Sequence, residues 1–329
     1  MFEHRAPQLL ALLIVCLSFV VQPLVAAQSP APSAVDWERL RAALRHQIEV
    51  APPAYDLLQP DRPEQSPEEA AASLPPVASF RATMVHLAWQ CMSTFRLTSS
   101  SAPSSSSSAF EGGCDGARIR FAPEATWPEN ARLSFALIQL QPVRIAFPAV
   151  SWADLIVAAG TVALEDAGVL TLPFCAGRTD AEAPSPIAMR PGPTFAARGA
   201  EVRAYLAATG LTLREWVALA ARPRSRVMMG AAGYVGTWAA SSPLRLSNAY
   251  FRALLGEQWE AYADDFTRPQ FRAVGKPTVV MTPLDLDLIE QPDAAAIVRE
   301  FAADNARFLA EFAAAWTRRM NADRGSACH

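Results

Sequence analysis

The chain has 329 residues, a formal net charge of −3 and 51% hydrophobic residues. That length and composition allow it to bury a substantial core, as one large domain or two small ones. Its Lys and Arg residues are scattered along the sequence, which excludes the concentrated basic footprint of a nucleic-acid-binding protein. We therefore expect no nucleic-acid partner.

The N-terminus, residues 1–27, is typical of a signal peptide. Arg5 supplies a positive charge, and the apolar run 9–21 is followed by small residues up to Ala27. The run is short for a bilayer span, so we expect cleavage near Ala27 and export of a mature chain without a transmembrane span. An uncleaved membrane anchor is the alternative, because Glu3 weakens the charged region.

The cysteines are compatible with an oxidising compartment. Removal of the leader takes away Cys16 and leaves Cys91, Cys114, Cys175 and Cys328. An even number of cysteines in an exported chain permits disulfides. A Cys91–Cys114 bridge would staple the serine-rich stretch between them, but free or differently paired thiols are an open alternative. No CxxC spacing indicates a zinc site, and no other metal site is expected.

The middle of the chain predicts a folded body after a loose extension. Residues 28–75 are rich in Pro, Ala and Glu and contain one short amphipathic stretch at 37–50. The body is expected at 76–324, followed by a tail at 325–329. Its helical periodicity, interrupted by Pro- and Gly-bearing loops, predicts an all-α fold.

The first helix of the body is predicted at 80–95. His86, Trp89 and Gln90 are spaced at i, i+3 and i+4 on it, so their side chains share one patch. Trp89 taken alone is more typical of a core position than of one that faces a cofactor.

Three further helices are predicted from their end signals and periodicity. One begins at Ser151, whose hydroxyl can cap it, ends at Gly168 and is apolar on nearly every face, which predicts a central position. Another begins at the capping box of Thr212 and Glu215 and is ended by Pro223. A long amphipathic helix near the C-terminus carries Ile297, Phe301, Phe308, Phe312 and Trp316.

Several short motifs follow one another in a recognisable order. They are His86-Leu-Ala-Trp89-Gln90, Arg120-Phe-Ala-Pro123, Trp127-Pro-Glu-Asn130, Ser151-Trp-Ala-Asp-Leu155, Gly177-Arg178-Thr-Asp180, Ser247-Asn248-Ala-Tyr-Phe251 and Asp285-Leu-Asp-Leu288. In this order the chain resembles the class I haem peroxidases, above all catalase-peroxidases, over roughly residues 80–323. The resemblance implies the helical haem-peroxidase fold.

The resemblance also assigns the distal positions of that family. Its enzymes use a distal His to move a proton between peroxide oxygens and a distal Arg to stabilise developing charge. Here the Arg position holds His86, the distal Trp is retained as Trp89, and the His position holds Gln90. Because Gln has no pKa near neutrality and cannot act as a general base, no catalytic residue is expected at these degenerate positions.

The proximal side lacks the histidine that would bind iron. The histidines of the chain are His4, His46, His86 and His329. By resemblance the ligand position falls at Pro223 or Arg224, and the carboxylate that orients the ligand matches Asp285. A guanidinium offers no lone pair to iron, so we expect Arg224 and Asp285 to form an ion pair, with Arg222 or Arg226 as substitutes. A solvated turn is the alternative.

Together these features predict an exported, haem-free pseudo-peroxidase with a binding or structural role. It would resemble the degenerate C-terminal copy of the fold in catalase-peroxidases, take no cofactor and bind an unidentified protein or small-molecule partner. The alternative is a haem b peroxidase acting on hydrogen peroxide with unconventional ligation, for which His86 would be the axial ligand.

Overall fold

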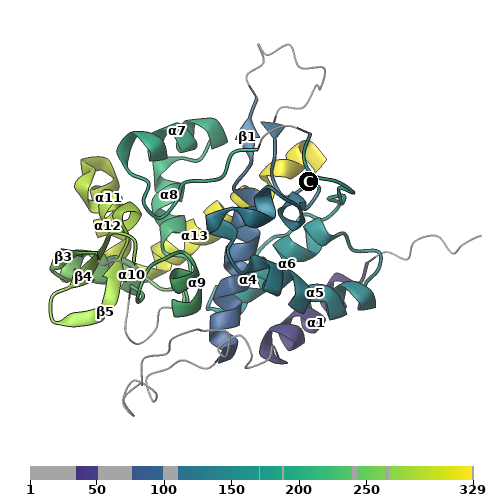
Figure 1. The fold of residues 1–329 in the computed structure, drawn as a ribbon, viewed down its shortest axis with the longest axis horizontal. Helices are drawn as coiled ribbons and strands as arrows, with labels where there is room; N and C mark the ends of the chain where they lie inside the picture. The colour runs from purple at the N-terminus through teal and green to yellow at the C-terminus, as the bar shows by residue number, and fades with distance from the viewer. Residues whose placement is uncertain are drawn as a thin grey trace, which may run out of the picture. The chain divides into compact units, whose positions relative to one another are not determined.

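Helices dominate the computed structural model, which describes residues 35–50, 76–98, 110–169, 171–186, 189–238, 244–263 and 267–327. The α-helices in these ranges are α1 (Trp37–Val50), α4 (Pro76–Met92), α5 (Leu133–Ala146), α6 (Trp152–Asp166), α7 (Gly199–Thr209), α8 (Leu213–Ala220), α9 (Arg226–Ala231), α10 (Ala249–Gly256), α11 (Pro283–Glu290), α12 (Pro292–Ala303) and α13 (Asn305–Met320). The short 3-10 helices are η1 (Arg118–Arg120), η2 (Glu124–Thr126), η3 (Pro128–Asn130) and η4 (Ala322–Ala327). The predicted helical fold is confirmed (Figure 1).

The helix pair α4 and α6 forms the centre of the body (Figure 1). The Ser151 hydroxyl accepts the Asp154 backbone N–H at 3.0 Å and caps α6, as its sequence predicts. Gly160 allows the two helices to approach closely, because a Cβ atom at this position would lie 2.4 Å from the Cβ of Ala88. The predicted central place of the apolar helix is therefore correct.

The amphipathic stretch at 37–50 is part of the core, contrary to the loose extension expected from its composition. Leu40 and Leu44 of α1 are buried against α5 and α6. Arg45 pairs with Glu165 at the end of α6, with Nη2 and Oε2 2.9 Å apart. An apolar stripe and an ion pair thus hold α1 in place.

The long helix predicted near the C-terminus is two helices. The Asp304 side chain accepts the backbone N–H of Arg307 at 3.0 Å and begins α13 anew after α12 has ended. Phe301 of α12 and Phe308 and Trp316 of α13 are nevertheless all buried in one core. The apolar periodicity runs across the break, which explains why the sequence pattern indicated one helix.

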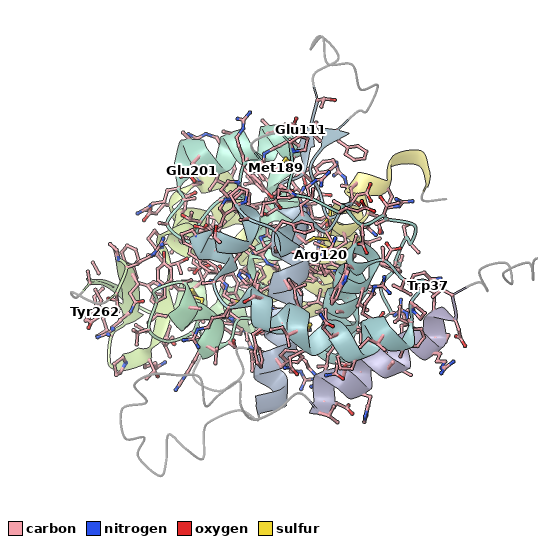
Figure 2. All side chains as sticks on the ribbon, turned by 45° about the vertical axis from the view of Figure 1, so that its right-hand side comes forward. Trp37, Glu111, Arg120, Met189, Glu201 and Tyr262 are labelled. Carbon is pink, nitrogen blue, oxygen red and sulfur yellow. A yellow bond between two sulfur atoms is a disulfide. The ribbon has the colours of Figure 1, made fainter. Side chains whose placement is uncertain are left out.

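Two small antiparallel sheets complete the described elements. The strands are β1 (Arg96–Leu97) with β2 (Phe110–Glu111), and β3 (Trp259–Tyr262), β4 (Gln270–Ala273) and β5 (Lys276–Met281) in the order β3-β4-β5. In the larger sheet Trp259 pairs with Ala273 and Arg272 with Val280. Side chains fill the space between the helices, and Tyr262 on β3 and Trp37 on α1 lie at opposite sides of Figure 2.

The ends of the chain fall partly outside this description. The predicted signal peptide at 1–27 lies outside the described residues. Within the described ranges, no helix combines the length and the apolar character that a membrane crossing requires.

Candidate functional site

Arg224 and Asp285 form a buried, bidentate ion pair. Arg224 follows the end of α8, and Asp285 lies in the first turn of α11. Arg224 Nη1 donates to Asp285 Oδ2 and Nη2 to Oδ1, both at 2.8 Å. The two residues are 3% and 0% exposed. The predicted pairing is confirmed, and the exposed-turn alternative does not apply to Arg224.

The Asp285 carboxylate is fully engaged by protein donors. The Tyr250 hydroxyl donates to Oδ1 at 2.6 Å, and the backbone N–H and hydroxyl of Thr282 donate to Oδ2 at 2.8 Å each. Burial raises the pKa of Asp285, but the charge of Arg224 and these hydrogen bonds outweigh burial and lower the pKa overall. The carboxylate therefore combines an ion pair with the cap of α11.

His86 and Gln90 share a single backbone acceptor on the other side of the site. His86 Nε2 lies 3.0 Å from the Glu129 carbonyl oxygen, and Gln90 Nε2 donates to the same oxygen at 3.3 Å. Because a carbonyl only accepts, we assign the ring proton of His86 to Nε2 and the lone pair to Nδ1. Burial lowers the pKa of His86 to about 4, and the nearby charges of Arg222 and Arg224 lower it as well. His86 is therefore neutral near pH 7.

Trp89 contacts the turn that carries the arginines. The guanidinium carbon of Arg222 lies 3.6 Å from the centre of the Trp89 ring, and Trp89 packs on Trp216 with ring centres 6.2 Å apart. Arg226, by contrast, is exposed. The structure thus brings His86, Trp89, Arg222, Arg224 and Asp285 to one centre and leaves Arg226 outside it.

These residues do not fit a haem held in the way that the resemblance implies. Such a haem needs a proximal ligand with a free lone pair, and the Arg224 guanidinium has none. Arg222 also touches Trp89 directly, so the distal helix and the proximal turn close on each other. No hydrogen bond of His86 Nδ1 is found within the described part of the chain, and the ring stacks on Phe195 at 6.5 Å between ring centres.

A buried arginine of α13, which the sequence did not predict, is also part of the site. Arg319 Nη2 donates to the Met92 carbonyl at 2.6 Å and to the Tyr205 hydroxyl at 2.7 Å. It lies three residues after Trp316, on the apolar face of α13. A charged residue on the buried face of an amphipathic helix was the available signal.

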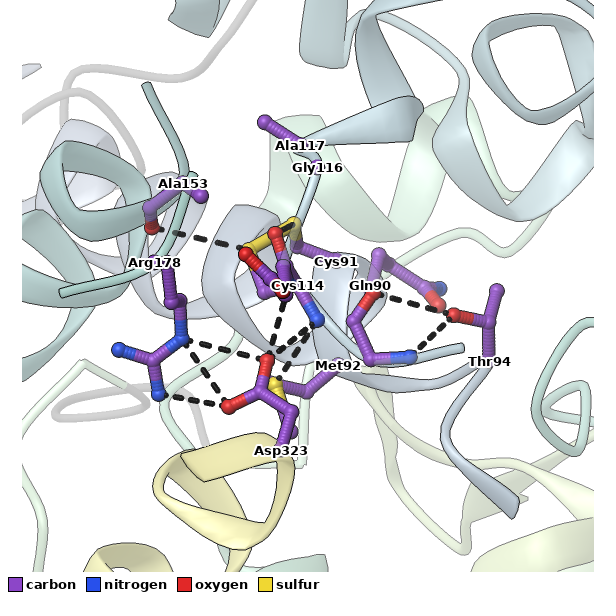
Figure 3. The surroundings of a disulfide bond; sticks show 12 residues. Gln90, Cys91, Met92, Thr94, Cys114, Gly116, Ala117, Ala153, Arg178 and Asp323 are labelled. Carbon is purple, nitrogen blue, oxygen red and sulfur yellow. Dashed lines mark hydrogen bonds and ion pairs between the residues drawn. A yellow bond between two sulfur atoms is a disulfide. The ribbon is translucent and has the colours of Figure 1, made fainter. Parts of the chain in front are cut away.

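A second buried charge network surrounds a disulfide. Cys91 and Cys114 are bridged, which settles the pairing that the sequence left open (Figure 3). Arg178 Nη1 lies 3.1 Å from Asp154 Oδ1, and its Nη2 lies 2.8 Å from Asp323 Oδ1. Asp323 Oδ2 accepts the Cys114 backbone N–H at 2.8 Å. The network therefore joins α6, the disulfide and η4.

The described residues contain no candidate site for a metal ion. In these ranges no group of His, Cys, Asp or Glu side chains is arranged to hold one. Cys175 is also disulfide-bonded.

Comparison with known proteins adds a family to this geometry. A family model described as Peroxidase matches residues 68–304. A protein of Pyricularia oryzae, named an inferred heme-binding peroxidase, is 35% identical over 243 residues, which are 72% of this chain and 77% of the relative. One of the same name from Cryptococcus neoformans var. neoformans is 32% identical over 240 residues, 71% and 69% of the two chains. The mitochondrial cytochrome c peroxidase of Pyricularia oryzae is 30% identical over 255 residues, 77% and 66% of the two chains.

These names correct the cofactor prediction made from the sequence. The absence of a proximal histidine predicts a protein without cofactor, whereas the similar proteins are named heme-binding peroxidases and cytochrome c peroxidase. The prediction of no cofactor is therefore wrong, because these names point to haem.

Proposed function

Because the chain belongs to the peroxidase family, we propose that it is a degenerate member in which the side chains of peroxide chemistry have been replaced and the centre serves a structural and binding role. The observation that carries this proposal is the buried pair of Arg224 and Asp285. The carboxylate that would orient a proximal ligand is instead saturated by a guanidinium, a tyrosine hydroxyl and a helix cap.

The distal residues support the same proposal. Peroxide cleavage needs a group that takes up a proton and returns it, and such a group works best with a pKa near the working pH. The pKa of His86 is about 4, and its Nε2 proton is directed to Glu129. Gln90 does not titrate. These two side chains therefore supply no effective proton carrier.

Export belongs to the proposal as well. The leader-like pattern at 1–27 supports it, and so does the Cys91–Cys114 disulfide, because disulfides persist mainly in oxidising compartments. N-terminal sequencing of the protein from its natural source is expected to begin near Gln28. An intact Met1 on the natural protein would contradict export by cleavage.

The names of the relatives favour a second candidate, a haem peroxidase that acts on hydrogen peroxide with unconventional ligation. The structural observation on its side is the neutral His86 ring, whose Nδ1 takes part in no hydrogen bond among the described residues. The two candidates differ in whether the protein accelerates peroxide turnover.

Peroxide turnover by the purified chain decides between them. The full chain would be produced with haem supplied and assayed with hydrogen peroxide and a dye donor, beside free hemin at the same haem concentration. We expect turnover no faster than that of free hemin. Turnover well above it that disappears in His86→Gln would establish the second candidate, whereas a Soret band alone reports haem uptake and leaves the proposal about chemistry standing.

A further inference from the structure

Three guanidinium groups gather around two aromatic rings, those of Trp89 and Tyr205. Arg222 lies 3.6 Å from the ring centre of Trp89, and Arg319 lies 5.9 Å from it. Arg96 and Arg319 lie 4.8 and 5.7 Å from the ring centre of Tyr205. We call Arg96, Arg222 and Arg319 the arginine cluster.

No guanidinium of the arginine cluster is in direct contact with a carboxylate of the described residues, and the charges of Asp285 and Glu111 act on Arg222 and Arg96 only from beyond ion-pair distance. None of its three members has an Asp or Glu oxygen of the described residues within ion-pair distance. Their hydrogen bonds go to carbonyl and hydroxyl oxygens only. The other buried arginines, Arg178 and Arg224, each have a carboxylate partner. Arg319 is the fully buried member of the cluster. An unpaired cation in low dielectric is costly, so this exception requires an explanation.

The same place has an excess of hydrogen-bond donors. Arg319 Nε and Trp216 Nε1 are buried without an acceptor among the described residues. Both groups only donate. Burial lowers the pKa of Arg222 to about 9, with the charge of Arg224 as a further cause, and burial also lowers the pKa of Arg96. A negatively charged oxygen would satisfy both the buried N–H donors and the guanidinium groups of the cluster.

We propose that the arginine cluster binds a small oxyanion of the carboxylate or phosphate type, docked on Arg222 beside Trp89. Arg222 is half-buried, and its Nη1 already donates to the Leu219 carbonyl, but the remaining N–H groups of its planar guanidinium suit the oxygens of an anion. Arg319 and Arg96 supply positive potential around it. The inference rests on the proposed function, because it names the ligand class of the rebuilt centre. A free anion and a porphyrin propionate offer the same chemistry.

The test compares three proteins at constant ionic strength. The full chain, Arg222→Gln and Arg226→Gln would be titrated with inorganic phosphate, with acetate and with iron-free protoporphyrin IX, and the Tm and tryptophan fluorescence recorded. Arg226 is a matched control, because it lies in the same turn and is exposed. The Tm of the parent is expected to rise with the logarithm of ligand concentration and that of Arg222→Gln to stay flat. Arg226→Gln is expected to respond like the parent.

The separate titrations with phosphate, acetate and protoporphyrin IX identify the source of the oxyanion. A response to phosphate or acetate assigns a free anion, and a response to protoporphyrin alone assigns a propionate. Without added anion, Arg222→Gln is expected to melt no earlier than the parent, since it removes an unpaired cation. If Arg222→Gln does not fold, Arg222→Lys keeps the charge but loses the fork and is expected to respond more weakly.

Equal responses in the parent and Arg222→Gln, or no response to any probe, would overturn the site. That result is separable from the proposed function, because peroxide turnover is measured independently. If the protein shows neither peroxide turnover nor a response to anions, only the anion site is contradicted. If it turns over peroxide faster than free hemin, the proposed function is contradicted as well.

Discussion

At the scale of single residues, the buried guanidinium of Arg224 depends on Asp285 for its charge partner. Asp285→Ala is expected to leave a buried guanidinium uncompensated and to lower the free energy of unfolding by about 3 to 5 kcal/mol. Replacing both residues, by Arg224→Met with Asp285→Leu, removes the stranded charge and should cost much less than the sum of the single changes. Urea denaturation of the four proteins measures the coupling. Single effects below about 0.5 kcal/mol that simply add would show that the pair is unimportant.

His86 predicts how stability depends on pH. Its pKa falls from 6.5 in its ordinary state to about 4 in the fold, so the unfolded chain binds more protons between these values. Stability should therefore be complete above about pH 6.5 and fall as the pH is lowered towards 4, by about 3 kcal/mol from this residue. The lowered pKa of Asp285 adds a loss in the same direction at lower pH, below its ordinary value of 3.8.

The pH prediction is checked with His86→Gln, which retains a donor for the Glu129 carbonyl but does not titrate. Denaturation midpoints of the parent and the variant would be compared between pH 4 and 7. The stability difference between them should change across that interval. Parallel curves would mean that His86 titrates equally in the folded and unfolded chains.

At the scale of elements, the close approach of α4 and α6 depends on one missing methyl group. Gly160→Ala would place a Cβ atom 2.4 Å from that of Ala88, so the helices must separate and we expect destabilisation of about 1 to 3 kcal/mol. Gly230→Ala in α9 is the matched control, because a Cβ there meets nothing within 4 Å. It should be neutral or stabilising by up to about 1 kcal/mol. Thermal melts that shift equally for both would refute the contact argument.

Helix starts with local caps were predictable, and elements defined by distant partners were not. Ser151 and Thr212 each cap a helix where the sequence places it, because the capping groups lie within three residues. The start of α13 at Asp304 was hidden by apolar periodicity that continues across it. The strands β3 to β5 are four to six residues long and depend on pairing with one another, so periodicity gave little sign of them.

In the candidate site, too, some contacts could be predicted from the sequence and those between distant segments could not. Arg224 and Asp285 could be paired in advance because a family resemblance aligned both positions. Arg319 could not, since its acceptor on Met92 is 227 residues away and no local pattern connects them. The cofactor prediction failed for a different reason. It took the loss of one ligand residue as the loss of haem, while the names of the relatives point to haem.

At the scale of the whole molecule, the Cys91–Cys114 disulfide should act on the unfolded chain. It joins residues 23 positions apart, and closing such a loop stabilises the fold by about 3 kcal/mol in the chain-entropy model. The double variant Cys91→Ala, Cys114→Ala should therefore melt at a lower temperature. Both residues are buried, so dithiothreitol is expected to reduce the bridge only as fast as the protein opens. Rapid reduction under native conditions, followed by thiol labelling at Cys91, would contradict this protection.

Asp323 imposes an order in time on these contacts. It accepts the backbone N–H of Cys114, which precedes it by 209 residues, and it supplies one of the two carboxylates around Arg178. A ribosome that adds roughly 5 to 20 residues per second needs on the order of 10 to 40 seconds to cover that distance. Throughout that time Asp323 is missing as a partner of Arg178 and of the Cys114 backbone N–H. The region around the disulfide therefore cannot reach its final packing. The body is thus built to finish folding late, only after the C-terminal segment that carries Asp323 has been synthesised.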